Sequence, residues 1–172
     1  YSTLVAIVGN APMKEYEPTE ENVKTHRDVA SAVLQKTSVL PVAFGMVFKN
    51  KKILLAAIRK VYPLLYKSLL AVRNKVELGL KVVLPEEVNF GELSNGKSRE
   101  EFLQELEKDF LEKLGSIAKH TKKGKLFSDR LALNTSFLVT RDSIEKFSEE
   151  VGNLEKQYPK LKIQYSGPWP AY

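Results

Sequence analysis

The chain has 172 residues, 43% of them hydrophobic, and a formal net charge of +6 at pH 7. This length allows one domain or two small ones, and the apolar fraction is ordinary for a globular protein. Cysteine is absent, which excludes disulfides and thiol catalysis and favours a reducing, cytoplasmic location. No uninterrupted apolar run reaches about 18 residues, so no membrane-spanning segment is predicted.

The positive charge lies in the first part of the chain. Residues 1–74 contain 11 Lys and Arg against 5 Asp and Glu, whereas residues 75–172 contain 16 of each. No acidic residue lies between Val29 and Val76. This change in composition predicts a boundary near Asn74, with a basic α+β domain over residues 1–74 and a second domain over residues 75–172.

The first predicted elements are a strand and a helix. Residues 3–8, TLVAIV, form a short apolar run that predicts a buried strand. Thr19 is a suitable N-cap for a helix that continues to about residue 35. The predicted buried face of this helix carries Val23, Val29, Ala30, Val33 and Leu34. His26 lies on the same face, where a packed, hydrogen-bonded histidine is favoured over a ligand or an acid–base group.

A second apolar segment precedes the central helix. Residues 39–48, VLPVAFGMVF, are β-prone and contain Pro41 and Gly45. Apolar positions at helical spacing then predict a helix over residues 51–73, and Pro63 inside it predicts a kink or two helices in line. The cations of this region form either a solvated face or an electrostatic docking surface for an acidic partner.

The second domain alternates strands and helices. Residues 76–84 and 131–139 alternate in hydropathy and predict half-buried strands. Capping boxes, Ser98 with Glu101 and Asp142 with Glu145, predict the start of the two helices. A third strand is predicted over 160–165. The tract HTKKGK at 120–125 reads as a loop, and the proline-flanked tail around Trp169 reads as extended.

This order predicts an α+β protein of two small domains. The second domain approaches a ferredoxin-like, split βαβ sandwich with one sheet under two helices. One strand of that arrangement is missing from the pattern. It corresponds to the weak run at Leu126 and Phe127, or the fold is a variant.

Residues 91–98, GELSNGKS, match the pattern G-x-x-x-x-G-K-[ST] of phosphate loops. The preceding segment is too short and acidic for the buried strand that launches such a loop, and Glu100 and Glu101 would repel phosphates. A polar loop with Ser98 as N-cap is the favoured interpretation. The two histidines, His26 and His120, lack metal-ligand spacing. No active site, metal or cofactor is therefore predicted.

Three blocks of the sequence resemble the gas vesicle accessory proteins GvpF/GvpL. They are EYEPTEENVKTHRDV near the start, VLPVAFGMVF followed by a helix and VELGLKV, and the end from LALNTSFLVT to the closing YSGPWPAY. The match is weakest between Leu84 and Lys125, and Pro63 is unusual for the family. Relative to the family, we expect an N-terminal stretch, and with it the first strands of the first domain, to be missing here.

The resemblance implies a non-enzymatic accessory or minor structural protein of the gas vesicle. It would bind the main shell protein, together with other gas vesicle accessory proteins, and assist shell nucleation and assembly. The first candidate surface for that client is the unit around residues 39–48. The candidate partner-binding residues are Phe44, Phe48, Lys49, Lys51, Lys52, Arg59, Lys60 and Trp169.

Two alternatives remain from the residues. The first is nucleotide binding at residues 91–98. The second is a basic nucleic-acid-binding module, since ferredoxin-like sheets can stack bases on aromatics of their open face. Phe137 and Tyr165 are predicted to face the helices instead, and the cations to cluster before Asn74. We therefore expect only weak, nonspecific binding of RNA or DNA near physiological salt.

Overall fold

The computed structural model describes residues 4–86 and 90–171. It divides into two compact units, one of Tyr1–Arg73 with Pro170–Tyr172 and one of Asn74–Trp169. We call them unit 1 and unit 2.

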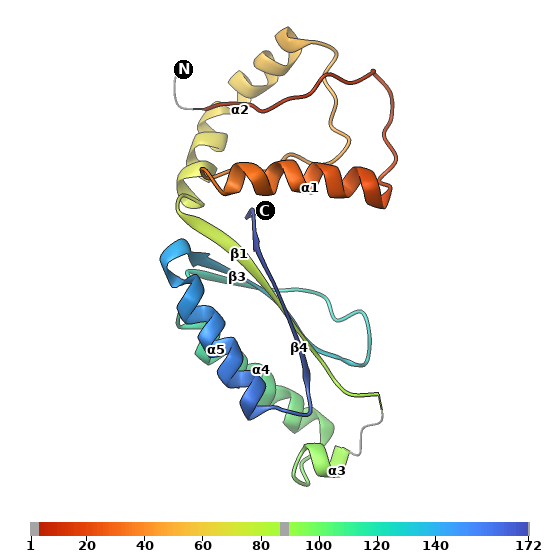
Figure 1. Cartoon of the computed structure of the whole chain (residues 1–172), viewed down its shortest axis with the longest axis vertical. Coiled ribbons are helices and arrows are strands. Elements are labelled where there is room, and N and C mark those ends of the chain that lie inside the picture. The colour runs from red at the N-terminus through yellow and green to blue at the C-terminus, as the bar shows by residue number, and fades with distance from the viewer. Residues whose placement is uncertain (1–3, 87–89, 172) are drawn as a thin grey trace. The chain divides into compact units, whose positions relative to one another are not determined.

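Unit 1 contains two helices, α1 (Glu20–Leu34) and α2 (Lys51–Ala71). Each begins at a side-chain cap: Thr19 accepts a hydrogen bond from the N–H of Asn22, and Asn50 accepts one from the N–H of Ile53. Helix α2 is one continuous helix with Pro63 inside it, and Figure 1 shows its axis bending along its length. This agrees with the predicted kink.

One strand prediction in unit 1 is wrong, and the β-prone segment at 39–48 also forms no strand. Residues 4–8 of the predicted strand belong to no helix or strand, and residues 39–48 contain a turn around Gly45, whose φ is +80°. The predicted buried face of α1 is also too wide. Ala30 and Leu34 are buried, whereas Val23 and Val29 are exposed.

Unit 2 is built on one antiparallel sheet. Its strands β1 (Lys75–Val83), β2 (His120–Lys123), β3 (Leu131–Thr140) and β4 (Lys162–Trp169) lie in the order β2-β3-β1-β4. The helices are α3 (Phe90–Leu93), α4 (Arg99–Gly115) and α5 (Ile144–Gln157). Helices α4 and α5 lie together on one side of the sheet (Figure 1). The α+β class is confirmed, and the order β1-α4-β2-β3-α5-β4 is consistent with a ferredoxin-like, split βαβ sandwich.

The core of unit 2 lies between the sheet and these two helices. Alternate residues of β1 and β3 face the helices, as the predicted strands required. The side chains that fill this layer are Val76, Leu78, Leu80, Val82, Phe137, Val139, Phe102, Leu106, Phe110, Leu114, Phe147, Val151 and Leu154. Phe137 contacts Phe147 with ring centroids 5.2 Å apart.

Three local predictions in unit 2 are corrected. The missing strand is β2, inside the tract read as a loop, and it pairs with β3. Leu126 and Phe127 are exposed and lie in the loop that follows β2. The predicted capping box of Asp142 does not form. Instead a 3₁₀ turn, Arg141–Ser143, precedes α5, and the hydroxyls of Thr140 and Ser143 lie 2.8 Å apart.

Strand β4 extends further into the proline-flanked tail than expected, because it contains a bulge. Glu77 pairs with Trp169 and Gly79 with Ser166, so β4 has one residue more than β1 between these pairs. Gly167 in the bulge has φ +116°, and a Cβ there would lie 2.8 Å from the carbonyl oxygen of Glu77. The extra residue moves Trp169 to the face of the sheet opposite the helices, since successive side chains alternate.

Candidate functional site

Residues 91–98 form a closed turn before α4. The N–H of Gly96 donates to the carbonyl of Gly91 at 3.1 Å, and the N–H of Lys97 donates to the carbonyl of Ser94 at 3.2 Å. A phosphate loop works by directing such N–H groups at the phosphates. Here these donors are used within the turn, so the loop offers no comparable cradle.

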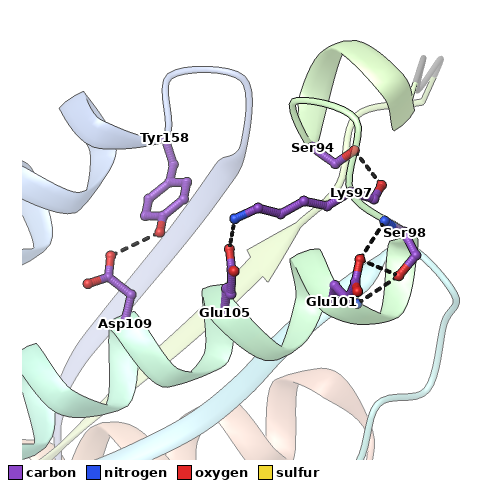
Figure 2. Close-up of polar contacts among 7 residues, drawn as sticks. All are labelled: Ser94, Lys97, Ser98, Glu101, Glu105, Asp109 and Tyr158. Carbon is purple, nitrogen blue, oxygen red and sulfur yellow. Dashed lines mark hydrogen bonds and ion pairs between the residues drawn. The ribbon is translucent and has the colours of Figure 1, made fainter.

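The N-terminus of α4 is capped by its own carboxylate. The N–H and the hydroxyl of Ser98 each donate to Glu101 at 3.0 Å, and the N–H of Glu101 donates back to the Ser98 hydroxyl at 3.3 Å (Figure 2). The predicted capping box is confirmed. The bonds from the Ser98 backbone and side chain lower the pKa of Glu101. A negative charge therefore lies where a phosphate would have to bind.

Lys97, the lysine of the sequence pattern, is already paired. Its ammonium group contacts the carboxylate of Glu105 on α4 (Figure 2). The hydroxyl of the buried Ser94 donates to the carbonyl of Lys97 at 2.7 Å. These contacts favour the interpretation of a polar loop with Ser98 as N-cap over the nucleotide site.

A cleft of about 370 Å³ lies beside this turn, lined among others by Lys97, Glu105, Tyr158, Pro159 and Leu161. Two residues that line the cleft also bind Asp109 of α4, which accepts hydrogen bonds from the Tyr158 hydroxyl at 2.9 Å and from the Gln157 amide at 2.8 Å. Burial and the neighbouring Asp109 raise the pKa of Tyr158 to about 12. Tyr158 therefore acts as a hydrogen-bond donor that joins α4 to the end of α5, not as a base.

Within residues 4–86 and 90–171, no three His, Asp or Glu side chains are grouped so that they could hold an ion. In the same ranges no helix has the length and apolar character needed to span a membrane.

His26 has the structural role that its position in α1 predicted. Its Nε2 lies 2.8 Å from the carbonyl oxygen of Val42, and its ring meets Phe44 edge-on with centroids 5.8 Å apart. The ring therefore fastens α1 to the irregular segment at 39–48. This contact leaves Phe44 half-buried.

The candidate partner-binding residues divide between the two units. Phe44 and Phe48 are half-buried in unit 1. The exposed cations Lys49, Lys51, Lys52, Arg59 and Lys60 lie at the start and along the first half of α2. Trp169 belongs to unit 2, where its indole N–H donates to Ser166 at 3.3 Å. Their contact with a partner stays a prediction.

An apolar run in unit 1 is exposed, whereas the sequence analysis predicted that it would be buried. Val5, Ile7 and Val8 expose 88%, 60% and 67% of their surface. Among the residues that the structure describes, no hydrogen bond holds the main chain of residues 4–8. The apolar run was visible in the sequence, but it indicates burial only if the chain itself covers it. The run thus presents apolar side chains together with backbone groups that pair with no described part of the main chain.

Comparison with known proteins gives a consistent result over the whole chain. A model of the family described as gas vesicle synthesis protein GvpL/GvpF matches residues 1–101 and 94–172. Gas vesicle protein F of Haloferax mediterranei is 33% identical over 176 residues, covering 100% of this chain and 78% of that protein. Gas vesicle protein F1 of Halobacterium salinarum is 30% identical over 175 residues, covering 100% and 77%.

Two crystal structures share the fold. That of gas vesicle protein GvpF from Anabaena sp. PCC7120 has a TM-score of 0.81 and 17% identity, and covers 94% of this chain and 80% of that one. That of GvpF from Microcystis aeruginosa has a TM-score of 0.78 and 17% identity, with 94% and 81% covered.

Proposed function

The chain belongs to the GvpL/GvpF family of gas vesicle synthesis proteins, and from this premise we propose that it binds the main gas vesicle shell protein and assists nucleation and assembly of the shell. It acts as a minor accessory component beside other gas vesicle proteins, and no catalytic step is part of this role. The proposal requires a surface that can shield or extend an apolar client.

The exposed run at residues 4–8 carries the proposal. Its backbone forms no hydrogen bond with the main chain of any described residue, and Val5, Ile7 and Val8 are open to solvent. A client strand can add to such a segment through main-chain hydrogen bonds, while side-chain contacts provide selectivity. Val42 and Met46, in the segment at 39–48, add exposed apolar surface to the same unit.

The cations of α2 support the apolar surface. Lys49, Lys51 and Lys52 lie together at the start of the helix, and Arg59 and Lys60 follow two turns later. Unlike cations that are paired within a fold, none of these five forms an ion pair with a described residue. These cations would attract acidic groups of a partner and so raise the association rate constant. Their effect on the equilibrium affinity would be smaller than their effect on that rate.

The test measures whether the chain keeps purified shell protein in the supernatant and retains it in a pull-down. We expect the wild type to do both and the double variant Val5→Lys/Ile7→Lys to do neither, since charges on the run oppose burial in an interface. The control is Val29→Lys, which adds a charge at another exposed apolar position of the same unit, on α1.

Two outcomes contradict the proposal. One is a wild-type chain that neither binds the shell protein nor prevents its aggregation. The other is a double variant that performs as well as Val29→Lys, which would place the client surface elsewhere.

A further inference from the structure

The side of the unit 2 sheet opposite α4 and α5 carries a line of lysines. The strand register places Lys122 of β2 and Gly79 of β1 opposite the same residue, Ser136, and places Lys81 in the next row beside Gln164. Lys162 of β4 lies in the row after that, opposite Val83. We call this side of the sheet the open face. Figure 1 shows no helix of unit 2 across it.

The lysines cross the open face diagonally. With strands about 4.8 Å apart and about 3.4 Å between successive residues, the Cα atoms of Lys122 and Lys81 are separated by about 12 Å, and those of Lys81 and Lys162 by about 8 Å. These separations are spanned by roughly two to four residues of an extended chain. Ser136 and Gln164, which can hydrogen-bond, lie along the same diagonal.

Unit 2 separates its charges between two layers. Helix α4 has six acidic and three basic residues, and α5 has four acidic and two basic residues. On the helix side, lysines pair with these acids, as Lys123 does with Glu107 at 2.5 Å and Lys113 with Asp109 at 3.0 Å. By contrast, Lys81, Lys122 and Lys162 form no ion pair with any residue that the structure describes.

The chemistry of the open face favours a polypeptide over a nucleic acid. Of the three aromatic residues on the strands, Trp169 lies on the open face, whereas Phe137 and Tyr165 face the helices, where both contact Phe147. These two are not available to stack bases. The exposed Phe127 already has the Lys81 ammonium 5.2 Å from its ring centroid.

We propose that the open face of unit 2 docks an acidic segment of a partner polypeptide, whose carboxylates contact Lys81, Lys122 and Lys162. This surface is separate from the apolar run of unit 1 and does not depend on it. A chain with both surfaces can hold two partners, one through apolar contacts and one through charge.

The test uses the full chain and short labelled poly-L-glutamate at about 0.15 M salt. Binding is measured by anisotropy and by the emission of Trp169, the single tryptophan, which lies on the open face. The charge-removing variant is Lys81→Gln/Lys122→Gln/Lys162→Gln. Its matched control is Lys146→Gln/Lys156→Gln/Lys160→Gln, which removes the same charge from α5 and the turn after it.

We expect poly-L-glutamate to bind the wild type and change the Trp169 emission. The open-face variant should lose at least about fivefold in affinity, because each exposed ion pair contributes up to about that factor. The α5 control, and a variant with arginine at the three open-face positions, should stay within about twofold of the wild type. Urea unfolding of all variants checks that their stability is comparable.

Three results would overturn this inference. The first is that the wild type does not bind poly-L-glutamate. The second is an equal loss of affinity in both glutamine variants, which would indicate attraction by net charge alone. The third is tighter binding of poly(U) than of poly-L-glutamate. The last result would assign the open face to single-stranded nucleic acid. None of these readouts involves the shell protein, so a failure here is distinct from a failure of the proposed function.

Discussion

Tyr158 is held by a carboxylate that also binds two other side chains. Asp109 accepts bonds from Tyr158, Gln157 and Lys113. Tyr158→Phe removes one of them and keeps the ring contact with Phe110, which has centroids 5.5 Å apart. We expect a loss of about 1 kcal/mol in the free energy of unfolding at neutral pH. Tyr66→Phe, at an exposed position, is the control and should change it by less than about 0.5 kcal/mol.

The raised pKa of Tyr158 gives this contribution a defined pH dependence. The phenol is protonated more tightly in the folded state, with a pKa of about 12 against 10 when unperturbed. Its stabilising effect is therefore complete below pH 10 and is lost as the pH rises from 10 towards 12. Absorbance titration at alkaline pH should show a tyrosine that ionises near pH 12, and this component should be missing from the titration of Tyr158→Phe. A titration curve unchanged by the substitution would contradict this.

Thr135 presents the opposite case, a buried hydroxyl without a partner. Its Oγ1 has no hydrogen bond in the described part of the chain. Thr135→Val keeps the shape and removes the unsatisfied group, so we expect a gain of about 1 kcal/mol in urea unfolding. Thr140→Val, at a hydroxyl 2.8 Å from that of Ser143, should instead destabilise the protein. Equal effects of the two substitutions would contradict the argument.

Two glycines make a matched pair. Gly167→Ala places a Cβ 2.8 Å from a backbone oxygen at φ +116°, and should lower the free energy of unfolding by more than about 1 kcal/mol. Gly152 lies inside α5 with open space around its Cβ position. Gly152→Ala should raise the free energy of unfolding by about 0.5–1 kcal/mol. Urea unfolding measures both, and a neutral Gly167→Ala would show that the bulge tolerates a side chain.

At the scale of single elements, the turn before α4 gives a direct test against nucleotide binding. Lys97 is paired with Glu105, and the N–H groups of Gly96 and Lys97 are bonded within the turn. Saturating Mg-ATP should therefore leave the melting temperature unchanged, in the wild type and in Lys97→Ala alike, since only a ligand that binds the native state raises it. A rise that Lys97→Ala abolishes would restore the nucleotide site.

The elements that could be predicted are those marked by residues close together in the sequence or by a regular alternation of apolar and polar residues. The capping box of Ser98 involves residues three apart, and α4 follows from it. The alternation of β1 and β3 is visible because one face of each strand packs on helices. Glu145 lies three residues after Asp142 as well, yet no side chain caps α5, whose preceding residue Ser143 has helical rather than extended dihedrals.

Other elements depend on partners that a pattern does not reveal. Of the four residues of β2, Thr121 alone is partly buried and the rest are exposed, so no apolar alternation marks the strand. It exists because β3 offers an edge to pair with. Lys81 could be placed on the open face from the alternation of β1, but Lys122 could not, since its strand was not predicted. The prediction for residues 4–8 was wrong for the opposite reason. Their sequence has the pattern of a strand, but no described residue pairs with them.

At the scale of the whole molecule, apolar burial is unequal between the units. Among the described residues, the buried apolar side chains of unit 1 are Ala30, Leu34, Pro170 and Ala171, and all others are in unit 2. A fully buried large apolar side chain contributes about 1.5–3 kcal/mol. Unit 2 therefore has most of the apolar stabilisation and should unfold at the higher temperature.

Calorimetry can test this inequality. We expect the full chain to unfold in two transitions, with a calorimetric enthalpy above the van't Hoff value. Residues 74–169 alone should reproduce the upper transition. A single two-state transition in the full chain, or a fragment without cooperative unfolding, would show that the units do not have separate stabilities.

The pairing of β1 with β4 has a consequence for the path of the chain. The chain passes from unit 1 into unit 2 at Asn74 and returns to unit 1 after Trp169. The two crossings lie at the ends of neighbouring strands, since Glu77, three residues after the first crossing, pairs with Trp169 about 5 Å away. Unit 2 thus has the topology of an inserted domain with adjacent ends. In unit 2 alone, a short linker could join those ends, and the chain could be cut in the exposed loop between β2 and β3 to create new termini. The result would be a circular permutant of unit 2 with the same sheet.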